Sequence, residues 1–159
     1  ERYQWCGNFQ EGMCPVRHAD GLYSHIGIDG SHAYHRRYRY AGDYKDGIGV
    51  VQRDDGLHTH IDRNGNQNHG KWFGNLDVYH KGFARAEDGN GWFHIDIRGQ
   101  PAYSRRFKAV EPFYNSQSRV EDFNGSLLVI DETGNTLCIL RPPIQSLTHT
   151  RIRREKTST

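Results

Sequence analysis

Three histidines at nearly constant spacing are the side chains best placed to do chemistry in this sequence. They are His25, His60 and His94, and the intervals between them are 35 and 34 residues. Three imidazoles can bind zinc or iron when one nitrogen of each lies about 2 Å from a common point. A closed ring of units would gather them, whereas a linear stack would hold them apart. One hypothesis is therefore a small histidine-ligated metalloprotein or enzyme, and the other is that each imidazole hydrogen-bonds a neighbouring backbone.

The segments around these histidines are copies of one another. Residues 25–30, 60–65 and 94–99 all begin with His-Ile and end with Gly, and residues 129–134 keep the frame with Val129 in place of the histidine. Self-similarity at a period of about 35 residues is typical of repeat architectures, in which each unit packs on its neighbours.

Further columns of matched residues extend the repeat over four units, near residues 3–37, 38–72, 73–106 and 107–140. An aromatic residue opens each unit, and a second aromatic follows six residues later. The opening aromatics are Tyr3, Tyr38, Phe73 and Phe107, and the second aromatics are Phe9, Tyr44, Tyr79 and Phe113. So many columns in register define the units without reference to any other protein.

Each unit has the pattern of a β-hairpin followed by a connector. Short apolar or alternating runs such as residues 48–51 and 57–62 flank turn signals such as Asp54-Asp55-Gly56. Because an isolated hairpin is only marginally stable in water, stacking between units must supply the stability. The sequence predicts an all-β domain over residues 1–140, either a twisted hairpin array or open solenoid, or alternatively a small closed propeller-like ring.

Composition narrows the class of protein. The net charge of +2 is too small to indicate a nucleic-acid partner, and no run approaches the roughly 18 apolar residues of a membrane-spanning helix. The three cysteines are odd in number and unpatterned, which favours reduced thiols and a cytoplasmic protein. Residues 141–159 lack the repeat and are basic, so we expect a linker or disordered tail there. Because the chain begins at Glu1, we expect one domain of a longer polypeptide.

A column of acidic residues lies just before the closing glycine. Asp62, Asp96 and Asp131 occupy it, and Gly27 takes the place in the first unit. Aspartate before a turn commonly accepts hydrogen bonds from the backbone N–H groups that follow. We expect this structural role rather than acid–base catalysis.

Cationic residues gather in one register just before the opening aromatics. The residues expected to contact a partner are Arg36, Arg37, Trp72, Arg105 and Arg106, with Lys71 in the same register. Interleaved cations and aromatic rings can hold an acidic peptide or a phosphate-bearing ligand. The alternative is a solvated connector whose arginine stems cover the rings.

These motifs resemble the bacterial WG-repeat (KWG-type) family over residues 3–138. Residues 9–16 and 44–51 are similar to the family's F-x-E-G-L-A-x-V strand, and residues 92–96 to its W-G-Y-I-D strand. Other residues replace the family's Trp-Gly pair, as in His58-Thr59, so this would be a divergent branch. The resemblance implies an interaction module, often attached to a catalytic domain such as a methyltransferase, and it supplies no catalytic residues.

Together these observations predict a non-catalytic recognition or scaffolding module. We expect a protein or peptide partner, or an attached catalytic domain, and neither a cofactor nor a nucleic acid. The sequence lacks the motifs of a P-loop, a dinucleotide-binding strand–helix unit and a paired-cysteine metal site. The edges of the hairpins could also accept a strand from a partner.

Overall fold

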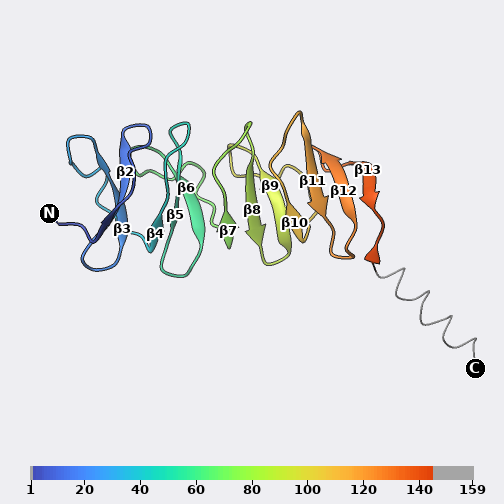
Figure 1. The fold of residues 1–159 in the computed structure, drawn as a ribbon, viewed down its shortest axis with the longest axis horizontal. Coiled ribbons are helices and arrows are strands. Elements are labelled where there is room, and N and C mark those ends of the chain that lie inside the picture. Colours follow the sequence, from blue (N-terminus) through green and yellow to red (C-terminus); the bar gives the residue numbers. More distant parts are fainter. Residues whose placement is uncertain (1, 145–159) are drawn as a thin grey trace, which may run out of the picture.

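The computed structural model describes residues 2–144 as four small antiparallel sheets arranged in a row (Figure 1). The predicted all-β fold with four repeated units is confirmed, and the sheets resemble the blades of a propeller. The first sheet and the last lie at opposite ends of the row.

Each of the first three sheets contains a two-residue edge strand, a central strand and a third strand, in sequence order. The edge strands are β1 (Trp5–Cys6), β4 (Tyr40–Ala41), β7 (Asn75–Leu76) and, in the last sheet, β10 (Ala109–Val110). The central strands are β2 (Met13–Arg17), β5 (Gly49–Gln52), β8 (Ala84–Asp88) and β11 (Gln117–Glu121). The third strands are β3 (Tyr23–Gly27), β6 (His58–Ile61), β9 (Gly91–Ile95) and β12 (Leu127–Asp131).

A fourth strand, β13 (Thr136–Arg141), completes the last sheet and pairs with β12. It ends directly before Pro142, which has no N–H group to continue the ladder. The predicted basic tail lies outside the described residues from residue 145 onward. No helix in the described part of the chain has the length and apolar character needed to cross a membrane.

Neighbouring sheets are joined by one crossing segment. Tyr38 exchanges two backbone hydrogen bonds with Tyr23 of β3, at 2.6 and 2.8 Å, and the next residue, Arg39, donates its N–H to Gln52 of β5. The same bridges recur between His58 and Phe73 and at the following junction. The two-residue edge strand begins after the opening aromatic, because the chain changes sheets at that residue.

The apolar core lies between the sheets as well as within them. The opening aromatics Tyr38, Phe73 and Phe107 are buried, and Phe73 packs edge-to-face on Phe93 at a ring separation of 5.9 Å. In β11 and β12 buried and more exposed side chains alternate, as expected of strands with one face on the core. The repeat therefore buries its aromatic columns at the joints between units.

Candidate functional site

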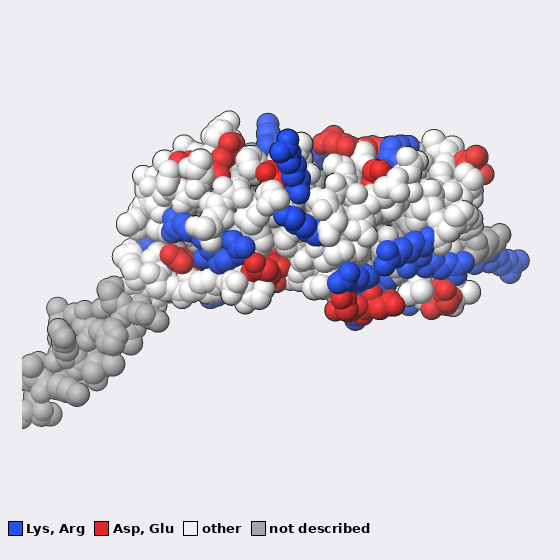
Figure 2. Space-filling model, turned by 180° about the vertical axis from the view of Figure 1, so that it is seen from behind, with Lys and Arg blue, Asp and Glu red and all other residues white. Residues whose placement is uncertain are grey.

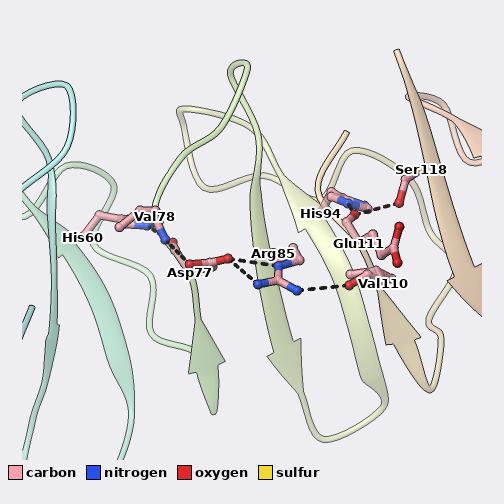
Figure 3. Close-up of polar contacts among 8 residues, drawn as sticks. All are labelled: His60, Asp77, Val78, Arg85, His94, Val110, Glu111 and Ser118. Carbon is pink, nitrogen blue, oxygen red and sulfur yellow. Dashed lines mark hydrogen bonds and ion pairs between the residues drawn. The ribbon is translucent and has the colours of Figure 1, made fainter. Parts of the chain in front are cut away.

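The three repeated histidines each connect one sheet to the next. Their side chains are buried, and each Nε2 lies within hydrogen-bond distance of a backbone carbonyl oxygen in the following unit. The distances are 2.6 Å from His25 to Gly42, 2.8 Å from His60 to Asp77 and 2.8 Å from His94 to Glu111. Figure 3 shows the second and third of these histidines reaching toward the neighbouring strands.

The hydrogen-bond partners determine which nitrogen carries the proton. A carbonyl oxygen only accepts, so Nε2–H of each imidazole must donate to it. Nδ1 is then an acceptor, and the hydroxyl groups of Tyr34 and Tyr103 donate to His25 and His94 at 2.7 and 2.6 Å. For His60 the donor is Nε2–H of His69, 2.9 Å away.

His69 confirms this assignment at its other nitrogen. Its Nδ1 accepts the backbone N–H of Lys71 at 3.0 Å, which leaves the proton on Nε2. A relay therefore runs from the Lys71 N–H through His69 and His60 to the Asp77 carbonyl, with a donor and an acceptor at every step. All these imidazoles are neutral in the relay.

Burial also favours the neutral form. Removal from water lowers the pKa of His25, and it lowers the pKa of His60 and of His94 to about 4. The second aromatic of the next unit packs against each ring, with ring separations of 4.7 Å for Tyr44, 4.4 Å for Tyr79 and 4.1 Å for Phe113. Each histidine is thus a polar core residue at a joint between units.

The metal-site hypothesis required His25, His60 and His94 to converge, and the structure does not bring them together. They lie on β3, β6 and β9, in three different sheets, and both nitrogens of each are engaged in the hydrogen bonds described above. Within residues 2–144 no group of three or more His, Cys, Asp or Glu side chains is arranged to hold a metal ion. The alternative, a hydrogen bond from each histidine to a neighbouring backbone, is what the structure contains.

The acidic column has the predicted turn-capping role. Oδ1 of Asp96 accepts the N–H groups of Arg98 and Gln100 at 2.9 and 3.0 Å, and Asp62 and Asp131 make equivalent pairs of bonds. In the first unit, where Gly27 occupies the column, Asp29 accepts the N–H of Ser31 instead. Asp29, two residues after Gly27, therefore caps the turn in the first unit.

The predicted cationic residues lie against aromatic rings. Arg36 stands over Tyr38 at 5.1 Å, Arg105 over Phe107 at 4.7 Å and Arg106 over Phe93 at 3.6 Å, each measured from the guanidinium carbon to the ring centre. Trp72 is covered at 4.2 Å by Arg53. Sequence reasoning missed Arg53, because it lies in a hairpin turn far from Trp72 along the chain.

Aspartates anchor several of these arginines. Arg37 pairs with Asp20 at 2.8 Å, Arg106 with Asp88 at 3.0 Å and Arg105 with Asp122 at 3.8 Å. Asp20, Asp88 and Asp122 flank the turns between central and third strands. Figure 2 shows the consequence on one face, where basic and acidic side chains are interleaved.

A polar pocket lies in the first unit. It is lined by His18, Ser24, His32, Tyr34, His35 and Arg37. His18 Nε2 lies 2.6 Å from the hydroxyl oxygen of Ser24, and both side chains are buried. Sequence reasoning did not single out His18; the available signal was that the other units carry Arg53, Asp88 and Asp122 in its place.

The three cysteines remain free thiols in the structure. Cys6 and Cys138 are exposed and Cys14 is buried, and burial raises the pKa of the Cys14 thiol. Its Sγ lies 3.2 Å from the Gly7 carbonyl oxygen.

Comparison with solved structures identifies the architecture. The computationally designed protein Ika8 superposes with a TM-score of 0.54 and 16% identity, over 83% of this chain and 47% of that one. BamB from Moraxella catarrhalis superposes with a TM-score of 0.52 and 14% identity, over 84% of this chain and 48% of that one. The WD40 β-propeller domain of Doa1 superposes with a TM-score of 0.44 and 9% identity, over 87% of this chain and 54% of that one.

This chain spans about half the length of the first two matched chains. No protein-family model matches the sequence, and no curated protein is significantly similar to it. At these identities the likeness concerns the fold. The chain has a propeller-like β-repeat fold of four small sheets.

Proposed function

We propose that this chain is a non-catalytic recognition or scaffolding module that binds an acidic segment of a protein partner. The contact surface is the arginine row, which we define as Arg36, Arg37, Arg105 and Arg106 with Trp72. The observation that carries the proposal is the repeated stacking of a guanidinium group on the opening aromatic two residues later. It occurs for Arg36 on Tyr38 and again, two units along, for Arg105 on Phe107.

Stacking prepares these side chains for recognition. A guanidinium plane held on a ring loses less rotamer freedom when it binds, and its planar set of N–H donors matches a carboxylate. The arginines remain within reach of solvent, since the side chains of Arg37 and Arg105 are 38% and 36% exposed. An acidic segment lying along the row would meet such groups at intervals set by the repeat.

The architecture supports a binding role. Propeller-like folds commonly serve as rigid platforms for proteins, and repeats that contact only their neighbours present extended surfaces. The resemblance to WG repeats adds the proposal that the module belongs to, or associates with, a larger cytoplasmic enzyme such as a methyltransferase. In that role it would present a partner to the catalytic domain.

Fluorescence anisotropy with a labelled glutamate-rich peptide tests the proposal. Arg36→Glu combined with Arg105→Glu should weaken binding at least tenfold. The control pair, Lys81→Glu with Arg98→Glu, changes the net charge equally at exposed positions elsewhere. It should change the affinity less than twofold.

A conservative variant separates stacking from charge. Arg36→Lys with Arg105→Lys keeps both charges but removes the planar fork, so we expect an intermediate loss. Equal losses in the two charge-reversal pairs would mean unspecific attraction by net charge, and that result would refute the arginine row as the contact surface. Full affinity in the Arg36→Glu and Arg105→Glu pair would refute it as well.

A further inference from the structure

We propose that a second copy of this chain docks head to tail, with the C-terminal end of one array packed on the N-terminal face of the other. The contact would repeat, between two molecules, the joint that the chain makes three times within itself. None of the residues changed in its test belongs to the arginine row or to the polar pocket of the first unit, so the test is separate from that of the proposed function.

The internal joint has two parts that recur. Each unit contributes its histidine and the side chain nine residues later, and the next unit contributes its second aromatic and its closing glycine. Tyr34 covers Gly65 so closely that a Cβ atom there would lie 2.6 Å from the tyrosine Cβ. His69 covers Gly99, and Tyr103 covers Gly134, in the same way.

The N-terminal face has these receiving groups without a cover. Phe9 is 49% exposed, whereas its equivalents Tyr44 and Phe113 are 3% and 1% exposed. A Cβ atom on Gly30 would meet no atom within 4 Å, although Gly30 is the equivalent of Gly65. The face that units two to four bury is therefore open on unit one.

At the C-terminal end, other residues replace the histidine and its partner, and exposed apolar side chains lie beside them. Val129 stands in the histidine column, and Cys138, nine residues later, stands in the column of Tyr34 and Tyr103. Leu137 is 50% exposed on β13, and its neighbours Ile139 and Leu140 are exposed as well. The histidine and its partner have thus been exchanged together for a valine and a cysteine, beside the exposed side chains of Leu137, Ile139 and Leu140.

Hydrogen bonding matches between the two ends. At internal joints the histidine donates to a carbonyl of the next unit, such as that of Gly42. The equivalent carbonyl on the N-terminal face is that of Gly7, where the Cys14 thiol is the donor at 3.2 Å. Val129 has no proton to donate, and the Gly7 carbonyl already accepts from the Cys14 thiol of its own unit. An apolar joint would therefore leave no hydrogen-bonding group without a partner at these two positions.

The two ends lie at opposite ends of the row, so a single copy cannot join them in the arrangement of Figure 1. Because the surfaces differ, the contact is heterologous: it either closes into a ring or continues as a chain of copies. Both forms require one N-terminal face and one C-terminal end at every joint.

Sedimentation velocity of the full chain at increasing concentration tests the proposal. The wild-type chain should associate, while Phe9→Glu and Leu137→Glu should each be monomeric, because either change places a carboxylate in every joint. Both residues are exposed, so far-ultraviolet circular dichroism should show the same fold. Ile97→Glu, at another exposed apolar side chain, is the matched control and should associate like the wild type.

Mixing the two variants gives the decisive result. An equimolar mixture should form heterodimers, since the intact C-terminal end of Phe9→Glu fits the intact N-terminal face of Leu137→Glu. A wild-type chain that stays monomeric at 200 µM would overturn the proposal. Failure of the mixture to associate would also overturn it, because a head-to-tail joint needs only one intact N-terminal face and one intact C-terminal end.

Discussion

His60 Nε2 lies 2.8 Å from the carbonyl oxygen of Asp77, on the far side of the joint between the second and third sheets. Nε2–H donates this bond, and Nδ1 must stay unprotonated to accept the N–H of His69, so the pair of bonds requires a neutral ring. His25 and His94 make the same bond to a carbonyl at the other joints. The stability of the array therefore depends on the protonation state of buried imidazoles, whose role is structural.

Replacing His60 by Phe should lower the free energy of unfolding by about 2–3 kcal/mol. The ring volume is kept, but the Asp77 carbonyl and the His69 N–H lose their buried partner. Urea denaturation followed by tryptophan fluorescence gives the value. His35→Phe is the control, because His35 is exposed and should change stability by less than about 0.5 kcal/mol. An unchanged midpoint in His60→Phe would contradict the relay.

The free energy of unfolding should fall as the pH is lowered from about 6.5 to about 4. In the folded state His60 and His94 have a pKa of about 4, whereas an unfolded histidine titrates near 6.5, so the unfolded chain binds more protons in this window. The loss should be on the order of 3 kcal/mol for each of the two residues, from about 1.4 kcal/mol per pKa unit.

Denaturation curves at half-unit pH steps would measure this slope. Carboxyl groups of the unfolded chain also take up protons near the lower end of the window, so the informative quantity is the difference from His94→Phe. That variant should lose part of the slope between pH 5 and 6.5. An identical slope in both proteins would show that His94 takes up protons as freely in the folded state as in the unfolded one.

Replacing Asp96 by Ala should destabilise the chain by about 1–2 kcal/mol. The carboxylate accepts two backbone N–H groups that otherwise turn to solvent. Asp96→Asn retains one acceptor oxygen and should lose about half as much. Thermal denaturation of the two variants side by side distinguishes a loss of hydrogen bonds from a loss of charge, and an Asn variant as unstable as the Ala variant would favour charge.

Gly65→Ala should be much more destabilising than Gly30→Ala. Both glycines have φ near +81°, so alanine has the same backbone strain at each, about 1 kcal/mol. Only at Gly65 would the new methyl group meet another residue, Tyr34, at 2.6 Å. We expect at least 2 kcal/mol of additional loss at Gly65, measured by urea denaturation at low protein concentration. Equal losses would show that the joint relaxes freely around the methyl group.

The repeat, the strands and the aspartate caps could be predicted because each depends on residues that are close together in the sequence or on a regular spacing. Asp96 and the N–H groups it accepts lie within four residues, so the turn needs no knowledge of the fold. The period likewise fixes which residues are equivalent. Neither inference depends on how the units are oriented.

Contacts between units could not be predicted, because they depend on the angle at which one sheet meets the next. The acceptor for His25 is a backbone carbonyl 17 residues later, and a backbone atom leaves no trace in the sequence. The stacking of Arg53 on Trp72 has the same origin: one comes from a hairpin turn and the other from a connector. The replacement of the repeated histidine by Val129 was visible in the sequence. Which contact that replacement removes could be seen only in the structure of the joint between units.

The segment that crosses from sheet to sheet at Tyr38 also determines how the chain should respond to mechanical force. Tyr38 holds one sheet through two hydrogen bonds to Tyr23 while Arg39 already belongs to the next. A chain stretched from its two ends should rupture first in the terminal sheets, which have one neighbour each, and then inward. Each rupture would release one repeat, roughly 120 Å of extended chain for about 35 residues. The array would therefore lengthen in discrete steps under tension.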